Sequence, residues 1–156
     1  MTLEELFAGK PIDIKRTMAR LKQVADELGL PLGERKKTFS SRLAQESAKW
    51  AESEGKGNAF HEAVFRAYFV DGKNIGRVDE LVNLAKSVGL PEEKARSVVE
   101  LRTFKEAVDS DWRRSHALGI TGVPTFMVDQ KATVGFQPYE EFEKFIKACG
   151  IRKRSP

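Results

Sequence analysis

Apolar residues recur every three to four positions along the first 118 residues of the chain. This period places them on one face of an α-helix and predicts a succession of amphipathic helices. Several of these segments end at a glycine, which readily adopts the left-handed conformation found just after a helix, and two of them continue into Leu-Pro. We expect helices over residues 3–7, 14–28, 42–54, 59–70, 79–88, 92–101 and 103–118.

The segment from 59 to 70 is more apolar than the others, with apolar positions around most of its circumference. Such a helix is typical of the centre of a bundle, and Asn58 is expected to cap its N-terminus. The remaining helices are expected to bury one face each. In the segment from 14 to 28, the residues expected to face inward are Ile14, Met18, Leu21, Val24, Ala25 and Leu28.

The periodicity changes after Gly119, where the sequence reads G-I-T-G-V-P-T-F-M-V from that residue onward. Pro124 has no backbone N–H to donate to a sheet, so it belongs at the first residue of a strand or at a sheet edge. A residue that precedes a proline is restricted to extended geometry, and here this residue is Val123. The apolar run from 125 to 128 then predicts a buried strand.

A hairpin and a final helix are expected to follow this strand. Residues 129–131 predict a three-residue turn, and residues 132–136 alternate in the way that is typical of a second strand. Pro138 is expected to start a helix that ends at Gly150. The residues of this helix that are expected to face inward are Tyr139, Phe142, Phe145 and Ile146.

Length and composition indicate one globular domain. The chain has 156 residues, of which 40% are hydrophobic and 32% are charged, and these fractions are ordinary for a globular protein. No apolar run reaches the roughly 20 residues that a transmembrane helix needs. The acidic N-terminal sequence lacks the layout of a signal peptide, so we expect a cytoplasmic protein with no membrane partner.

The net charge of +4 comes from 27 basic and 23 acidic residues. Apart from two short basic runs, at 35–37 and 152–154, the basic residues are scattered along the chain. Nucleic-acid binding usually requires a concentrated basic stripe. We therefore expect no nucleic-acid partner and interpret the charges as a solvated surface.

Candidate catalytic chemistry is limited because the chain has one cysteine, Cys149. An intrachain disulfide, a C-x-x-C site and a cysteine-rich zinc site all require more than one. Cys149 is expected in the last turn of the final helix, where the helix dipole disfavours a thiolate, so we interpret it as an inert thiol. Neither His61 nor His116 has a ligand partner at metal spacing, so we predict no metal site.

A long helix, the motif G-I-T-G-V-P-T-F, a hairpin, the motif G-F-Q-P and a final helix follow one another from residue 103 onward. This order resembles the C-terminal half of a DsbA-type thioredoxin-fold protein. The segment A-F-H-E-A-V-F-R-A-Y-F-V-D-G-K-N-I, from Ala59 to Ile75, is similar to the inserted helical subdomain in the cytoplasmic branch of that family. This branch contains dithiol oxidoreductases and glutathione-dependent 2-hydroxychromene-2-carboxylate isomerases.

The resemblance implies an α/β, mostly helical protein with an incomplete thioredoxin-like fold. Residues 1–118 would form the helical insertion, residues 119–150 a thioredoxin-like ββα unit, and residues 151–156 a basic tail that we expect to be disordered. Family members begin with a strand, a C-x-x-C or serine-containing site, a helix and a second strand, and this sequence has no such segment. We therefore expect no catalytic residue in this chain and no dithiol-disulfide activity from it alone.

In the family, the proline is cis, and the residue before it pairs through its backbone with an extended peptide or with glutathione. The substrate-binding residues that the resemblance implies are Thr121, Gly122, Val123, Pro124 and Thr125. Backbone groups of Val123 can form one rung of a sheet with such a ligand, although Pro124 can also serve only to shape the corner between loop and strand. His61 and Tyr68 are candidates for a groove that faces this loop, and both also fit packed or solvent-exposed side chains.

Two functions stay open at this point. The first is the substrate-binding part of a DsbA-like thiol-disulfide oxidoreductase, or of a glutathione-dependent isomerase. Its substrate would be a protein thiol, a disulfide or glutathione, and we expect no resident cofactor. The second is a non-catalytic binding or structural module. Because the strand at 125–128 would have an unpaired outer side, we also expect self-association into a homodimer through this edge.

Overall fold

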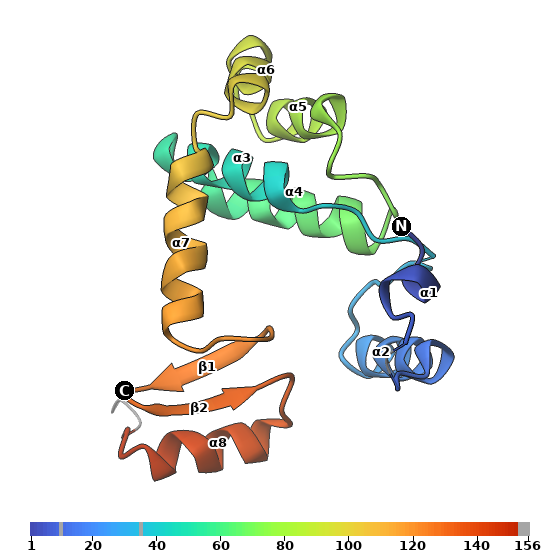
Figure 1. Ribbon diagram of the computed structural model, residues 1–156, viewed down its shortest axis with the longest axis vertical. Coiled ribbons are helices and arrows are strands. Elements are labelled where there is room, and N and C mark those ends of the chain that lie inside the picture. Colours follow the sequence, from blue (N-terminus) through green and yellow to red (C-terminus); the bar gives the residue numbers. More distant parts are fainter. Residues whose placement is uncertain (10, 35, 153–156) are drawn as a thin grey trace. The chain divides into compact units, whose positions relative to one another are not determined.

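The computed structural model describes residues 1–9, 11–34 and 36–152. In this part of the chain, seven helices precede a two-stranded sheet and an eighth helix follows it, which confirms the predicted order (Figure 1). The helices are α1 (Leu3–Leu6), α2 (Ile14–Glu27), α3 (Arg42–Ser53), α4 (Gly57–Phe69), α5 (Val78–Ser87), α6 (Glu92–Leu101), α7 (Lys105–Ala117) and α8 (Tyr139–Ala148), and the strands are β1 (Thr125–Val128) and β2 (Lys131–Val134).

The chain divides into two compact units, which we call unit 1 (Met1–Asp109) and unit 2 (Ser110–Pro156). The division falls within α7 rather than at the end of that helix. Most of the predicted basic tail, from 153 to 156, lies outside the described residues. Within the described part of the chain, no helix combines the length and the apolar character that crossing a membrane requires.

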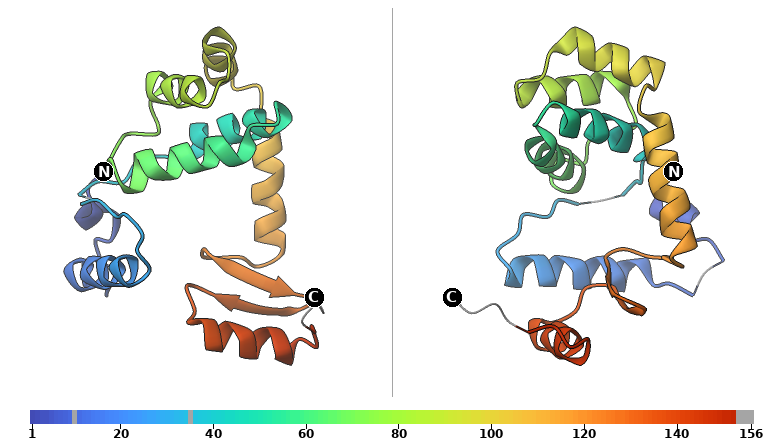
Figure 2. Two further views of the ribbon diagram at one scale, coloured as in Figure 1. Left: turned by 180° about the vertical axis from the view of Figure 1, so that it is seen from behind. Right: turned by 90° about the vertical axis from the view of Figure 1, so that its left-hand side faces the viewer.

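The core of unit 1 lies among α3, α4, α5 and α6, which pack against one another. Figure 2 shows α5 beside α6, and α3 beside α4, in both of its views. The large residues Trp50, Phe60 and Leu81 are almost completely shielded from solvent. The other buried members of this cluster are Ala44, Ala48, Ala51, Val64, Ala67, Ile75, Val82, Leu84, Ala85, Leu90, Ala95, Val98 and Val99. Burial of one large apolar side chain contributes about 1.5–3 kcal/mol, so this cluster is the main source of stability in unit 1.

The prediction that α4 is the central helix of the bundle rested on apolar positions around most of its circumference, and these positions are not all buried. Only one face of α4 is buried, and Phe65 outside that face is 57% exposed. The exposed aromatic rings contact each other along the helix instead, with the rings of Phe65 and Phe69 6.2 Å apart. The helix also begins at Gly57 rather than after Asn58. A Cβ atom at position 57 would lie 2.7 Å from the side chain of Glu52, so glycine allows α3 and α4 to join tightly.

α2 begins as predicted but is less buried than predicted. The carboxylate of Asp13 accepts a hydrogen bond from the backbone N–H of Arg16 at 3.0 Å and caps the helix. Within α2, however, only Ala25 is buried, and Leu21 and Leu28 are more than half exposed. The period of apolar residues correctly predicted a helix. The extensive contacts between helices in unit 1 lie among α3–α6, however, so the apolar face of α2 is largely uncovered.

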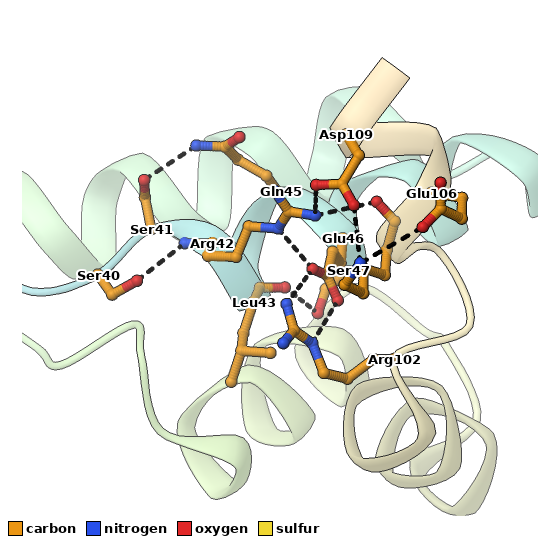
Figure 3. A network of polar contacts seen from close by, with 11 residues as sticks. Ser40, Ser41, Arg42, Leu43, Gln45, Glu46, Ser47, Arg102, Glu106 and Asp109 are labelled. Carbon is orange, nitrogen blue, oxygen red and sulfur yellow. Dashed lines mark hydrogen bonds and ion pairs between the residues drawn. The ribbon is translucent and has the colours of Figure 1, made fainter. Parts of the chain in front are cut away.

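A buried carboxylate links α3 to the C-terminal end of α6 (Figure 3). Glu46 is 1% exposed and accepts a hydrogen bond at 2.6 Å from Nε of Arg42. Two further bonds, at 2.6 and 3.1 Å, come from the guanidinium group of Arg102. Arg42 also donates to Asp109 in α7. A buried charge is costly without such partners, so the two arginines explain why a glutamate can occupy this position.

The charges of this network also set its protonation. Burial by itself raises the pKa of Glu46, but hydrogen bonds and charges from Arg102 and Arg42 outweigh burial, so the pKa of this carboxyl lies below its ordinary value. Hydrogen bonds from Lys105 and Arg42 likewise lower the pKa of Asp109. Both carboxyls are therefore ionised at neutral pH, and their attraction to the basic groups holds α3, α6 and the start of α7 together.

In unit 2, β1 and β2 form an antiparallel hairpin in which Val128 lies opposite Lys131. The turn therefore contains two residues, Asp129 and Gln130, and the prediction of a three-residue turn is wrong. Asp129 has a φ of 52°, in the left-handed region that aspartate tolerates better than most residues. The chain can therefore reverse one residue earlier, and β2 begins at Lys131 rather than at 132.

α8 runs along one face of the hairpin (Figure 1), where the rings of Phe126 and Phe142 lie 4.7 Å apart. Phe142, Phe145 and Ile146 are half-buried, in agreement with their predicted direction. The prediction for Tyr139 is wrong, because this first residue of α8 is 74% exposed. Among residues 110–152, the described part of unit 2, none is buried.

Candidate functional site

The loop between α7 and β1 begins with a well-defined helix end. Gly119 has a φ of 70°, as its position after the helix predicted. Its N–H donates to the carbonyl of His116 at 2.9 Å, and the N–H of Ile120 donates to the carbonyl of Ser115 at 3.0 Å. These bonds satisfy carbonyl groups that the helix leaves open, and they fix the direction in which the chain leaves α7.

Two hydrogen bonds hold the following loop residues. The hydroxyl group of Thr125 donates to the carbonyl of Gly122 at 2.6 Å. The N–H of Gly135, just after β2, donates to the carbonyl of Pro124 at 2.8 Å. The loop is therefore anchored on both sides of Val123, once to its own continuation and once to the neighbouring strand.

Val123 projects from this anchored loop. It is 89% exposed and forms no hydrogen bond with another described residue. The Val123–Pro124 peptide bond is cis. Thr121 and Pro124 are exposed as well. The N–H and C=O groups of Val123 are thus accessible to an extended ligand that pairs with them in the manner of a strand.

The five predicted loop residues are contiguous in unit 2, whereas the two groove candidates belong to unit 1. His61 is half-buried, and its Nε2 lies 3.4 Å from a carboxylate oxygen of Glu52. The hydroxyl group of Tyr68 lies 3.1 Å from that of Thr38, and its ring packs against the core of unit 1. Each side chain thus has contacts within its own unit, and a shared groove with the proline loop stays a prediction.

Two features of the structure, one in each unit, were not predicted from the sequence. One is the role of Gly135, whose φ of 87° presents its N–H to the proline carbonyl; the G-F-Q-P motif was the available signal. The other is a pocket of about 350 Å³ in unit 1. Its lining residues are Glu34, Lys36, Lys37, Phe39, Tyr68 and Gly72. This lining combines both signs of charge with two aromatic rings and does not indicate one class of ligand.

Cys149 is the C-cap residue of α8 and is half-buried. Its N–H donates to the carbonyl of Phe145 at 3.1 Å, so this residue closes the C-terminal end of α8. His116 lies in the last turn of α7. Across the described ranges, there is no group of three or more histidine, cysteine, aspartate or glutamate side chains that could hold a metal ion.

Comparison with known proteins identifies relatives of the whole arrangement. The family model for the DSBA-like thioredoxin domain matches residues 3–147. An uncharacterized protein of Bacillus subtilis, YwbO, is 33% identical over 105 residues, which make up 67% of this chain and 52% of that protein. This chain therefore spans about half the length of the curated relative that it matches.

Two solved structures share the fold. A probable DsbA oxidoreductase from Streptomyces coelicolor superposes with a TM-score of 0.79 and 27% identity, over 98% of this chain and 69% of that one. The cytosolic disulfide reductase DsbM from Pseudomonas aeruginosa gives a TM-score of 0.58 and 21% identity, over 86% of this chain and 75% of that one, and supports the fold alone. The match over nearly the whole length, and the resemblance carried by the two motifs, show that this chain belongs to the family of DSBA-like thioredoxin domains.

Proposed function

We propose that this chain is the substrate-binding part of a DsbA-like thiol-disulfide oxidoreductase and that the backbone of Val123 holds the substrate. The substrate is an extended peptide that carries a thiol or a disulfide, or it is glutathione. Thr121, Gly122, Pro124 and Thr125 shape the loop on either side. The observation that carries this proposal is the 89% exposure of Val123 between two anchored neighbours.

The geometry suits such a ligand for a physical reason. An extended chain pairs with an accessible N–H and C=O on a residue that is itself extended, and a following proline restricts Val123 to this geometry. The hydrogen bonds of Thr125 and Gly135 order the loop in the absence of ligand. Binding therefore requires little further ordering of the loop, which lowers its entropic cost.

The chemistry of the chain limits what it does alone. Thiol–disulfide exchange needs an attacking thiolate, and dithiol oxidation needs a second cysteine, which the sequence does not contain. We expect no insulin reduction above background from this chain, and the same result after Cys149→Ser. Turnover that persists in the Cys149→Ser variant would contradict this expectation.

A binding measurement tests the proposal directly. In a Cys149→Ser background, backbone amide NMR signals are followed while reduced glutathione, or a synthetic peptide with a single cysteine, is added. We expect the largest shifts at residues 121–125. Thr125→Ala removes the hydroxyl group that holds Gly122, and because one hydrogen bond is worth about 1 kcal/mol, affinity should fall roughly five-fold.

Thr133→Ala provides the matched control. Thr133 lies opposite Phe126 on the other strand of the same hairpin. The substitution therefore removes the same hydroxyl and methyl groups outside the loop, and it should leave the affinity unchanged. Equal losses in the two variants, or shifts confined to unit 1, would overturn the proposed binding role of the loop.

We also propose the cytoplasm as the compartment of this protein. The support is the fold shared with DsbM, which is described as cytosolic. Cell fractionation with an antibody against the chain tests this location, and recovery in a membrane or secreted fraction would contradict it.

A further inference from the structure

We infer that Gln137 is a positioning residue for the proposed binding loop. Its side chain holds the peptide group between Val134 and Gly135, and the same peptide group holds Pro124. The consequence for ligand binding rests on the proposed function. The first effect, however, is on the order of the loop, which can be measured without a ligand. All of these residues lie in unit 2, so the effect needs no contact between the two units.

The contact starts at the carbonyl end of one peptide group. The amide Nε2 of Gln137 donates a hydrogen bond to the carbonyl of Val134 at 3.1 Å. This carbonyl and the N–H of Gly135 are the two ends of the same planar peptide group. That N–H donates to the carbonyl of Pro124 at 2.8 Å. One rigid group therefore connects Gln137 to the residue that follows Val123.

The register of the hairpin explains why the loop depends on this peptide group. Gly135 lies opposite Pro124, one step beyond the pair formed by Thr125 and Val134. The two residues of a hydrogen-bonded pair in an antiparallel ladder normally exchange two bonds, but proline has no N–H to donate. The position of the Pro124 carbonyl therefore depends on the orientation of a single donor.

The direction of the Val134 carbonyl fits this role. Hydrogen-bonded and non-hydrogen-bonded pairs alternate along the ladder, so Val134 belongs to a non-hydrogen-bonded pair and directs its C=O to the outer edge of β2. The ladder of the described hairpin thus leaves that end of the peptide group to the amide of Gln137. Hydrogen bonds in such a chain polarise one another, so loss of the first bond should weaken the second.

The exposure of the side chains after β2 agrees with this arrangement. Phe136 is 61% exposed, whereas its polar neighbour Gln137 is half-buried. Burial of apolar surface alone would favour the opposite. Gly135 has a φ of 87°, a conformation that glycine adopts readily. The backbone after β2 thus places the amide against the end of the strand and leaves the aromatic ring in solvent.

Amide NMR tests the inference before any ligand is added. Gln137→Glu keeps the size of the side chain but removes the donor, and it should raise the rate of hydrogen exchange at Gly135 roughly three-fold. The order parameters of Gly122 and Val123 should fall in the same variant. A residue that only closes the turn before α8 would change the signals of residues 136–138 and leave the loop unchanged, and this result would overturn the inference.

Three further variants separate the lost donor from other effects. Gln130→Glu is the matched control, because Gln130 lies in the hairpin turn of the same unit, and it should leave the loop unchanged. Gln137→Met removes the donor without adding a charge and should act like Gln137→Glu. In a Gly135→Ala background, Gln137→Glu should add little, because both changes interrupt the same path. An equal effect of Gln130→Glu, or full additivity with Gly135→Ala, would contradict the positioning role.

Binding separates this inference from the proposed function. A synthetic peptide with a single cysteine is added to the Cys149→Ser chain with and without Gln137→Glu, and the affinity should fall roughly three-fold in the latter. If the peptide binds both chains equally, the inference fails and the proposed function stands. If the peptide binds neither chain, the proposed function fails, and the order parameters of the loop still decide whether Gln137 positions it.

Discussion

Unit 1 and unit 2 differ in how much apolar surface they remove from water. In unit 1, four helices enclose a cluster in which Trp50 is 2% exposed and Phe60 is 0% exposed. In unit 2, Val123 and Phe136 are 89% and 61% exposed, and none of the described residues from 110 to 152 is buried. Hydrophobic stabilisation follows the apolar area that is buried, so the free energy of folding is concentrated in unit 1.

The comparison shows that a precise backbone does not require a buried core. Unit 2 has a defined helix end at Gly119, a two-residue turn and a loop anchored through Thr125. Each hydrogen bond that holds these features contributes only about 1 kcal/mol net to stability. These bonds therefore determine the backbone conformation of unit 2 more than they stabilise the unit. A ligand at the loop would supply contacts that unit 2 does not make within itself.

The largest expected effect is a loss of core packing in unit 1. Phe60→Ala should lower the free energy of unfolding of unit 1 by about 3–5 kcal/mol, because it creates a cavity in a closely packed cluster. The matched change in unit 2, Phe142→Ala, affects a half-buried ring and should cost about 1 kcal/mol. Urea unfolding monitored by tryptophan fluorescence separates the two, since Trp50 lies in unit 1 and Trp112 in unit 2.

Single-tryptophan variants assign the transitions. With Trp112→Phe, the signal reports unit 1 through Trp50, and the Phe60→Ala shift should appear there in full. The signal of Trp112 should change at a lower urea concentration than that of Trp50. Equal destabilisation by Phe60→Ala and Phe142→Ala would show that the two units bury similar amounts of apolar surface, and it would contradict the difference between them.

The second effect tests whether charge also contributes to the stability of unit 1. Glu46→Ala leaves Arg42 and Arg102 without their shared buried partner, and removal of one member of such a pair is strongly destabilising, here by about 3 kcal/mol because Arg102 is partly exposed. Glu46→Gln keeps the volume and one acceptor oxygen and should cost less. Thermal unfolding at neutral pH measures both, and an unchanged midpoint in Glu46→Ala would mean that the network is not stabilising.

The pH dependence of this effect follows from the lowered pKa of Glu46. A carboxyl whose pKa is lower in the folded state stabilises the protein above its unfolded pKa, which is about 4.3 for glutamate. This contribution is lost as the pH falls through the folded value. The difference in stability between the original chain and Glu46→Gln should therefore be constant near neutral pH and shrink below about pH 4.

Local signals in the sequence predicted the elements and their order. The start of α6 was correct because Pro91 precedes the helix, and the end of α7 was correct to within one residue because Gly119 follows it. The position of the loop around Pro124 was also predicted, since a proline between a helix and an apolar run restricts the backbone by itself, while the binding role of its residues stays a prediction. Family membership followed from these same short motifs and is confirmed by the match over residues 3–147.

Burial and long-range partners could not be predicted in the same way. The amphipathic period of α2 shows which face is apolar but not whether another helix covers it, and Leu21 is exposed for this reason. The apolar circumference of α4 likewise does not show which of its apolar positions are covered, and Phe65 is 57% exposed. Glu46 and Arg102 meet across 56 residues of sequence, and no local pattern indicates such a pair.

The smallest expected effect concerns the hairpin turn of unit 2. Asp129 has a φ of 52°, and a side chain there costs up to about 1 kcal/mol. Asp129→Gly removes this cost but increases the freedom of the unfolded chain by about 0.5–1 kcal/mol. The two terms nearly cancel, so the stability of unit 2 should change by less than about 0.5 kcal/mol, measured through the Trp112 signal. A gain well above this value would mean that turn strain, rather than the shortage of buried apolar surface, limits unit 2.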